Sequence, residues 1–171
     1  TNIDAGEMNL ATSNGNIIVS NSEITYEMDL QTSNAKIDVS NIIIGTDMTL
    51  NTSNGKIYVD NVTVIGTGEL YADTSNSGIQ ISDVNFSTYV LDTSNGPINL
   101  SNLNVDLQDG TSVVLGTSNS GIDMEDVYVD IINGETTNAD IDFYNSDTSF
   151  HPSSLDLDTS NYQNVDTNVT E

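Results

Sequence analysis

The sequence predicts an all-β fold, a single-stranded β-solenoid (parallel β-helix) with about 20 residues per coil. Three observations support this prediction: a Thr-Ser-Asn tripeptide recurs through the chain, apolar residues alternate in steps of two, and Asn or Asp follows each alternating segment. Alternation in steps of two indicates strands, whereas helices need apolar steps of three and four. A propeller would need about 40 residues per blade. We therefore expect equivalent residues of successive coils to stack.

The tripeptide sets the length of each coil. It begins at intervals of 19 to 24 residues, at Thr12, Thr32, Thr52, Thr74, Thr93, Thr117 and Thr159, with a near-copy at Thr136. The repeat runs through all 171 residues, so we predict a single solenoid domain, 1–171. Residues 1–11 would form a partial N-terminal coil or a donated strand, 12–158 seven full coils, and 159–171 a degenerate terminal coil.

An apolar residue usually stands two positions before the Thr of each tripeptide, as at Leu30 and Leu50. If this residue points into the core, Thr and Asn share its side of the strand and Ser points outward. The Asn side chains would then line the inside of a corner and hydrogen-bond one another along the axis. This predicted Asn ladder comprises Asn14, Asn34, Asn54, Asn76, Asn95, Asn119, Asn138 and Asn161.

A short strand is expected after each tripeptide. The residue that follows Asn is small, such as Gly15 or Ala35, which suits a tight turn. Two apolar residues separated by one position come next, beginning at Ile17, Ile37, Ile57, Ile79, Ile98, Ile122 and Ile141. These pairs are the strongest predictions for the core.

A second turn is expected two residues beyond each pair. It would be formed by Asn21, Asn41, Asn61, Asp83, Asn102, Asp126 and Asn145. Alternation then restarts in a third stretch, for example at Ile24-x-Tyr26 and Leu103-x-Val105. Insertions near Gly66–Gly68, Gln108–Gly110 and Ser149–Pro152 follow this stretch, so this corner tolerates loops.

The last unit departs from the pattern, because Tyr162-Gln163-Asn164-Val165 stands where the apolar pair is expected. Terminal units of solenoids commonly differ from the others and cap the stack. Two interpretations stay open: the unit is a cap, or its strand is completed by another molecule.

The formal charge is −24, from 26 Asp and Glu residues against two Lys. This charge disfavours nucleic acid and anionic membrane surfaces as partners, because binding to phosphate requires neutralisation. Cations are the natural ligands of such a surface. The absence of Cys excludes a disulfide scaffold, and no apolar stretch approaches the ~20 residues of a membrane span.

The phrase Thr-Ser-Asn-Gly-x-Ile-x-Val at residues 12–19 and 52–59 resembles the repeat of the bacterial and archaeal adhesin family with TSNG-type β-solenoid coils. The resemblance covers residues 10–165. It implies a right-handed β-solenoid that is secreted or exposed at a cell surface and has no established catalytic site. The acidity and the near-absence of Lys and Arg depart from that family.

The sequence does not favour an enzyme. Its one imidazole is His151, in a loop rich in Ser and Pro, and its two lysines, Lys36 and Lys56, occupy one turn position in adjacent coils. Paired carboxylates or a basic residue beside a metal would be needed for the hydrolase and lyase chemistry that β-helices host.

A cluster of acids provides a candidate metal site, consisting of Asp123, Glu125, Asp140 and Asp142. Asp123 and Asp142 are expected to stack in adjacent coils, and Ca²⁺ would relieve their repulsion because it takes several carboxylate and carbonyl oxygens. A solvated acidic face explains the same residues without a metal. Asp73 and Asp92 are expected to form a second stacked pair.

Five Asn-x-Ser/Thr sequons are candidate glycosylation sites, at Asn51, Asn61, Asn85, Asn99 and Asn168. Several are expected by chance in a chain so rich in Asn and Thr.

A solenoid ends in strand edges that can pair with another chain. We therefore expect a non-enzymatic, extracellular or cell-surface structural protein that self-associates end to end into a filament or surface layer. The alternative is a monomeric adhesin or stalk domain that binds a surface ligand or glycan and is stabilised by calcium. No other cofactor is indicated, and direct membrane insertion is not expected.

Overall fold

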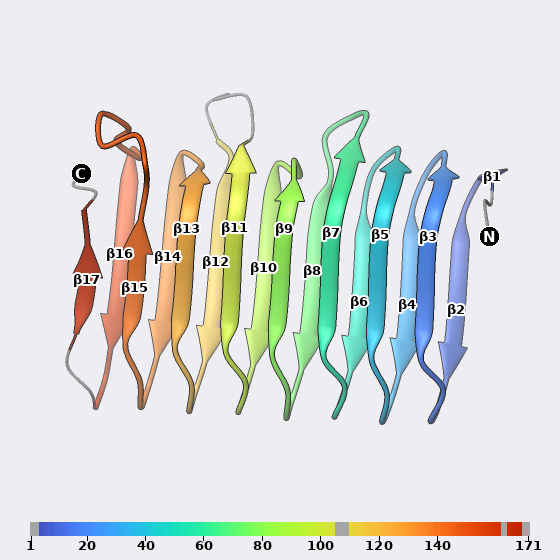
Figure 1. The fold of residues 1–171 in the computed structure, drawn as a ribbon, viewed down its shortest axis with the longest axis horizontal. Coiled ribbons are helices and arrows are strands. Elements are labelled where there is room, and N and C mark those ends of the chain that lie inside the picture. Colours follow the sequence, from blue (N-terminus) through green and yellow to red (C-terminus); the bar gives the residue numbers. More distant parts are fainter. Residues whose placement is uncertain (1–3, 105–109, 162–163, 169–171) are drawn as a thin grey trace.

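The computed structural model describes residues 4–104, 110–161 and 164–168, and these residues form a parallel β-solenoid of about eight turns (Figure 1). Among these residues, the paired strands are parallel and belong to successive coils, for example β3 with β5 and β4 with β6. The predicted fold class is therefore confirmed.

Two sheets make up the solenoid. In the part of the chain that the structure describes, the first sheet, here sheet A, has nine strands: β1 (Asp4–Ala5), β3 (Ile17–Ile24), β5 (Ile37–Ile44), β7 (Ile57–Val64), β9 (Ile79–Val84), β11 (Ile98–Asn104), β13 (Ile122–Tyr128), β15 (Ile141–Tyr144) and β17 (Val165–Thr167). Sheet B has eight strands among the same residues: β2 (Met8–Thr12), β4 (Met28–Thr32), β6 (Met48–Thr52), β8 (Glu69–Thr74), β10 (Thr88–Thr93), β12 (Ser112–Thr117), β14 (Ile131–Thr136) and β16 (Ser154–Thr159).

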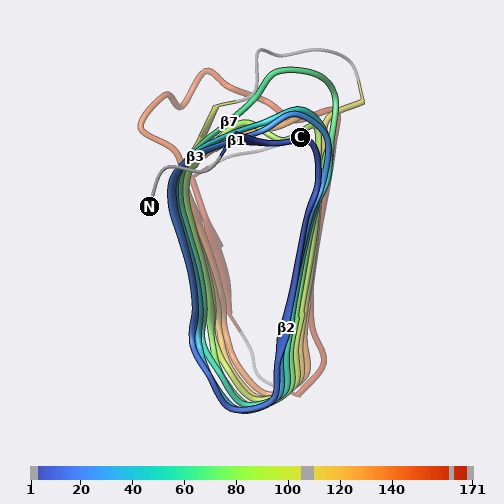
Figure 2. The ribbon, with the colours of Figure 1, turned by 90° about the vertical axis from the view of Figure 1, so that its right-hand side faces the viewer.

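The coil has three sides in projection (Figure 2). Sheet B forms one long side, and the Thr-Ser-Asn turns close the narrow end. Sheet A forms the other long side and bends onto a short third side. The front strands of Figure 1 run upward and the rear strands downward while the chain advances from right to left, so the winding is right-handed. This is the usual hand of a crossover between parallel strands.

The bend in sheet A lies at the second column of Asn and Asp residues. Asn21, Asn41, Asn61, Asp83, Asn102 and Asp126 have φ between 51° and 55°. Asn and Asp tolerate this left-handed region better than other residues with a side chain. The expected turn is therefore a bend within one strand in most coils, and the predicted third stretch continues that strand rather than starting a new one.

The core consists of stacked apolar columns between the two sheets. Ile37, Ile57 and Val59 are fully buried, and the apolar pairs predicted after the tripeptides are buried in every coil from Ile17 to Phe143. Larger residues fill the same columns in later coils. Tyr89 replaces the Met of earlier coils, packs edge to face against Phe86, and donates its hydroxyl to the Val84 carbonyl at 3.1 Å.

One core prediction is wrong. Tyr26 was expected to point inward but is 59% exposed, because Ser22 and Ile24 take the inward positions opposite Ile42 and Ile44. The prediction for Val105 lies outside the described residues. The other described residues of the third stretch, such as Val62 and Val64, are buried as expected.

The longer loops lie where the chain passes from a strand of sheet A to the next strand of sheet B, at the upper edge of Figure 1. The connections after β7 and β15 both lie there, as the insertions in the sequence predicted. In the second of these loops Phe150 is buried and packs edge to face on Tyr128, with ring centres 5.3 Å apart. This apolar contact anchors the loop on the core.

Candidate functional site

The predicted Asn ladder is present and continuous. Each Asn amide nitrogen donates to the amide oxygen of the preceding coil, from Asn34 to Asn14 at 2.8 Å through to Asn161 to Asn138 at 3.2 Å. The intermediate steps are 2.8 to 3.0 Å long. The ladder lies on the outside of the corner, however, because all eight side chains are exposed. The prediction that these residues line the inside is wrong.

The Thr of the tripeptide provides the inward contact that was assigned to Asn. Thr52 is buried, its hydroxyl donates to the Ala35 carbonyl of the preceding coil at 3.2 Å, and it accepts the Gly55 N–H of its own turn at 3.2 Å. Thr93 makes the same pair of bonds, to Ser77 and from Gly96. The Ser residues of the tripeptides are exposed, as the alternation predicted.

The hydrogen bonds of the Asn ladder and of the buried Thr hydroxyls all have one direction, because each side chain donates to the preceding coil. Along the ladder, nitrogens point toward the first coil and oxygens toward the last. Among the described residues, the Asn14 amide nitrogen at the first coil has no hydrogen-bond acceptor. At the last coil, the Asn161 amide oxygen has no donor among them. The two ends of the solenoid therefore carry complementary hydrogen-bonding groups.

The ends also expose members of core columns. Leu10 in β2 is 42% exposed, whereas Leu30 and Leu50 above it are fully buried. Val165 in β17 is 41% exposed, and its partner Ile141 is fully buried. A strand edge with an open apolar column is a template for another strand.

The last unit is less degenerate than expected. Val165 takes the position of the first apolar residue and pairs with Ile141, and Thr167 pairs with Phe143. The spacing from Asn161 to Val165 is one residue longer than from Asn138 to Ile141, so the first apolar residue is displaced by one position, and Thr167 takes the place of the second.

The acids of the candidate metal site lie on the outer face of sheet A near its end. Asp123 and Asp142 stack as predicted, and Asp166 extends the column by one coil. Partial burial and then the charges of Asp123, Asp166 and Asp140 raise the pKa of Asp142. A hydrogen bond to Asp166 raises the pKa of the neighbouring Tyr144 to about 12.

These carboxylates are arranged as a column rather than around one point. Glu125 lies opposite Tyr144, in a different outward column from Asp123. Within the described ranges, no group of three or more His, Cys, Asp or Glu side chains is placed to hold a metal ion. The calcium hypothesis therefore depends on like-charge repulsion, not on a formed coordination shell.

Sheet B carries a shallow polar hollow over its first coils. Gln31, Asn51, Asp73 and the Ser residues of the tripeptides line it, and its volume is about 400 Å³. Asp73 stacks on Asp92 as predicted, and burial followed by the Asp92 charge raises its pKa. The hollow is open and has no basic side chain in its lining.

The five sequons differ in how their amides are used. The Asn85 amide accepts from the Val64 N–H at 2.7 Å, and that of Asn168 accepts from the Asn145 N–H at 2.9 Å and donates to the Asn145 carbonyl at 2.8 Å. Asn61 donates to Asn41 at 2.8 Å. The amides of Asn51 and Asn99 form no hydrogen bond with the described residues, and both side chains lie half-buried on the outer faces of the sheets.

The bonds of Asn85 and Asn168 belong to a motif that sequence reasoning missed. Asn145 shares it, since its amide accepts from the Val127 N–H at 2.9 Å and donates to the Val127 carbonyl at 3.0 Å. In each case an amide side chain replaces the backbone partner where a strand ends. Each of these Asn residues directly follows the last residue of its strand, which is Val84, Tyr144 or Thr167.

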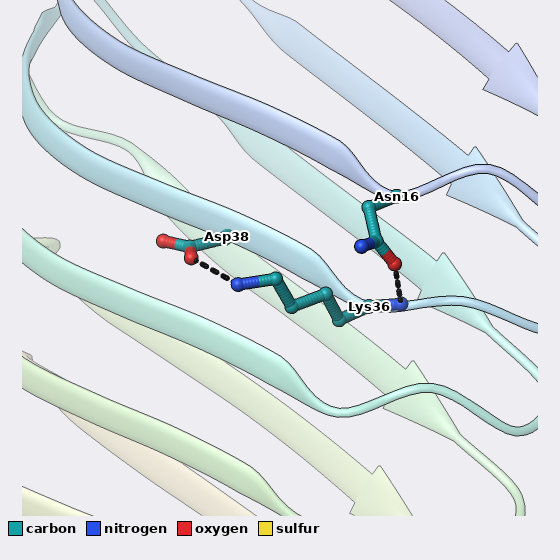
Figure 3. A network of polar contacts seen from close by, with 3 residues as sticks. All are labelled: Asn16, Lys36 and Asp38. Carbon is teal, nitrogen blue, oxygen red and sulfur yellow. Dashed lines mark hydrogen bonds and ion pairs between the residues drawn. The ribbon is translucent and has the colours of Figure 1, made fainter.

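The basic residues are occupied in structural contacts. Lys36 forms an ion pair with Asp38 at 2.8 Å, and the Asn16 amide oxygen accepts its backbone N–H (Figure 3). Lys56 donates to Gln80 at 2.8 Å. His151 lies exposed in the loop before β16, remote in sequence from both lysines.

Together, the fold and these surfaces define a class of protein, the right-handed parallel β-solenoids built from short repeats. Comparison with family models, curated proteins and solved structures finds no match. The adhesin resemblance therefore remains one of repeat motif. In the part of the chain that the structure describes, no helix is long and apolar enough to cross a membrane.

Proposed function

We propose that this protein is a non-enzymatic, extracellular structural protein that assembles end to end into a filament or a surface layer. The observation that carries the proposal is the pair of open ends, where Leu10 and Val165 expose columns that are buried elsewhere. Adding a second copy at either end would bury these residues and pair the free strand edges.

The surface charge supports end-to-end rather than lateral contact. The chain carries a formal charge of −24, which disfavours the approach of two outer faces. At an end, the contact is made by backbone groups and apolar columns instead. A contact between two different ends is heterologous, and it produces a filament when it does not close into a ring.

The alternative is a monomeric cell-surface adhesin or stalk domain. The shallow hollow on sheet B favours it, because Gln31, Asn51 and Asp73 present amide and carboxylate groups to a polar ligand such as a glycan. Calcium would stabilise this form by relieving the repulsion in the Asp123 and Asp142 column.

Sedimentation velocity over a hundredfold range of protein concentration, with and without millimolar Ca²⁺, separates the two. Assembly that grows with concentration and appears as fibres in negative-stain micrographs supports the structural proposal. A single sedimenting species at all concentrations, seen as short separate rods, would favour the monomeric alternative.

A further inference from the structure

We propose that the partner of each end is a second copy of this chain, docked head to tail in one register that continues every column of the solenoid. This inference rests on the proposed end-to-end assembly and specifies its contact. In this register β16 of one copy pairs with β2 of the next, and β17 pairs with β3. The described residues support it in four ways.

In this register the described strands at the two ends, β1 and β17, occupy different positions in the coil. β1 pairs with β3 at Glu23 and Ile24, so among the described residues the segment of β3 before the bend has no partner on its outer edge. β17 occupies the columns that begin at Ile17 and Val19, as traced through the successive pairings of sheet A. It therefore lies in the part of the coil that β1 leaves open.

The apolar columns continue through the contact. The pairings of sheet B place Leu155 in the column of Met8 and Leu157 in the column of Leu10. Leu155 and Leu157 are half-buried at the last coil and pack against the core. Stacked on the next copy, they would cover Leu10, as Leu50 covers Leu30 within the chain.

The Asn ladder closes with the right polarity. In the proposed register the Asn14 amide nitrogen of one copy reaches the Asn161 oxygen of the other, which repeats the step from Asn34 to Asn14. Two copies meeting head to head would bring donor to donor. The ladder therefore favours head-to-tail contact over both symmetric alternatives.

In three outward columns the proposed register avoids contact between like charges. The outward columns end in Asp156, Asp158 and Asp166 at the last coil, and they begin with Asn9, Ala11 and Ile18 at the first. Each terminal Asp thus meets a neutral residue in the next copy, whereas a tail-to-tail contact would oppose Asp to Asp. Like charges directly opposite each other in a sheet are destabilising.

The register can be tested on the full chain with two charge substitutions, one on each side of the proposed contact. Ala11→Glu would face Asp158 of the next copy, and we expect it to raise the concentration at half-assembly by up to about fivefold, as one destabilising cross-strand pair does. Adding Asp158→Lys should restore assembly to the wild-type concentration or below it. Assembly is measured by sedimentation velocity, and folding by circular dichroism.

A second pair of variants tests the apolar contact. Leu10→Glu places a charge in the junction and should abolish assembly over the same concentration range. Val114→Glu is the matched control, since Val114 is also 42% exposed in a strand of sheet B but faces outward in the middle of the rod. We expect Val114→Glu to assemble like the wild type.

The outcomes distinguish the register from the proposed function. If the wild type forms fibres but Asp158→Lys fails to rescue Ala11→Glu, or Leu10→Glu assembles normally, the register is wrong and end-to-end assembly stands on another contact. If the wild type does not assemble at any concentration, the proposed function and this junction are both overturned.

Discussion

At the residue scale, the three side chains of the tripeptide have different roles. Thr ties its own turn to the preceding coil from inside, as Thr52 does between Gly55 and Ala35. Asn ties the same coils together from outside through the amide ladder. Ser is exposed. A single turn sequence therefore provides both the bend and two connections along the axis.

Thr52→Val tests the internal connection. Val keeps the shape of Thr but leaves the buried Gly55 N–H without its acceptor, and an unpaired buried group costs about 1–3 kcal/mol. Chemical denaturation should show a loss of this size. Ser53→Ala is the control, because the exposed neighbour should change stability by less than about 0.5 kcal/mol; a larger effect there would reverse the assignment of the two faces.

Gly55 shows why small residues follow the ladder. A Cβ at this position would lie 1.7 Å from the Ala35 carbonyl oxygen of the preceding coil. We expect Gly55→Ala to force the two turns apart and to lower the melting temperature well below that of Ser53→Ala. Equal melting temperatures for the two variants would show that the turns are not in such close contact.

At the scale of the strand, burial is set by column. Ile57 is fully buried in β7 and has Ile37 and Ile79 as its neighbours in the stack. An ionised carboxylate in this column would have no partner, and burial of an unpaired charge is costly. Ile57→Asp should therefore unfold the protein, as judged by the loss of cooperative melting in circular dichroism. A melting curve like that of the wild type would contradict the core assignment.

The strands could be predicted from the sequence because their pattern is local. The Ile-x-Val pairs alternate in every coil, so their inward direction follows from strand geometry. The bend at Asn41 was expected as a separate turn, and the inward position of Ser22 was missed. Both depend on the pairing between coils, where Ser22 lies opposite Ile42. A single coil does not contain that information.

The candidate sites could be predicted less completely. The stacking of Asp123 on Asp142 follows from the period, whereas the third member Asp166 depends on the displaced pair in the last unit. The side-chain amides of Asn85 and Asn145 take the place of backbone hydrogen-bond partners for the neighbouring coil. Their role appears when the ends of adjacent strands are compared, and not in the sequence of one repeat.

At the scale of the whole molecule, charge opposes stacking. Burial and the nearby carboxylates raise the pKa of Asp142 from its ordinary value of 3.8. A raised pKa in the folded state means that ionisation disfavours folding. The associated stability is fully present below the ordinary pKa and is lost as the pH rises through the raised value.

Asp142→Asn removes this effect. At pH 7 the variant should melt at a higher temperature than the wild type, and the difference should shrink as the pH falls toward 3. Asp126, Asp130 and Asp147 act in the opposite direction, since hydrogen bonds lower their pKa values. These groups are common to both proteins, so the difference in melting temperature reports on Asp142. A difference independent of pH would contradict the role of its charge.

The whole-molecule property on which the proposed function depends is the polarity of the stack. The strands and the hydrogen bonds of the Asn ladder keep one direction from the first coil to the last. Three outward columns begin in neutral residues at the first coil and end in Asp at the last. Copies of such a rod can continue one another in a single orientation. In the proposed assembly, the ends would join the copies, and the acidic outer faces would disfavour lateral contact between rods.

The most direct test is cryo-electron microscopy of the purified wild-type protein concentrated at pH 7. We expect unbranched fibres with the width of one solenoid, a continuous strand repeat of about 4.8 Å along the axis, and no break in that repeat at the junctions between copies. Separate short rods at every concentration, or fibres whose strand repeat is interrupted at each junction, would contradict end-to-end continuation of the solenoid.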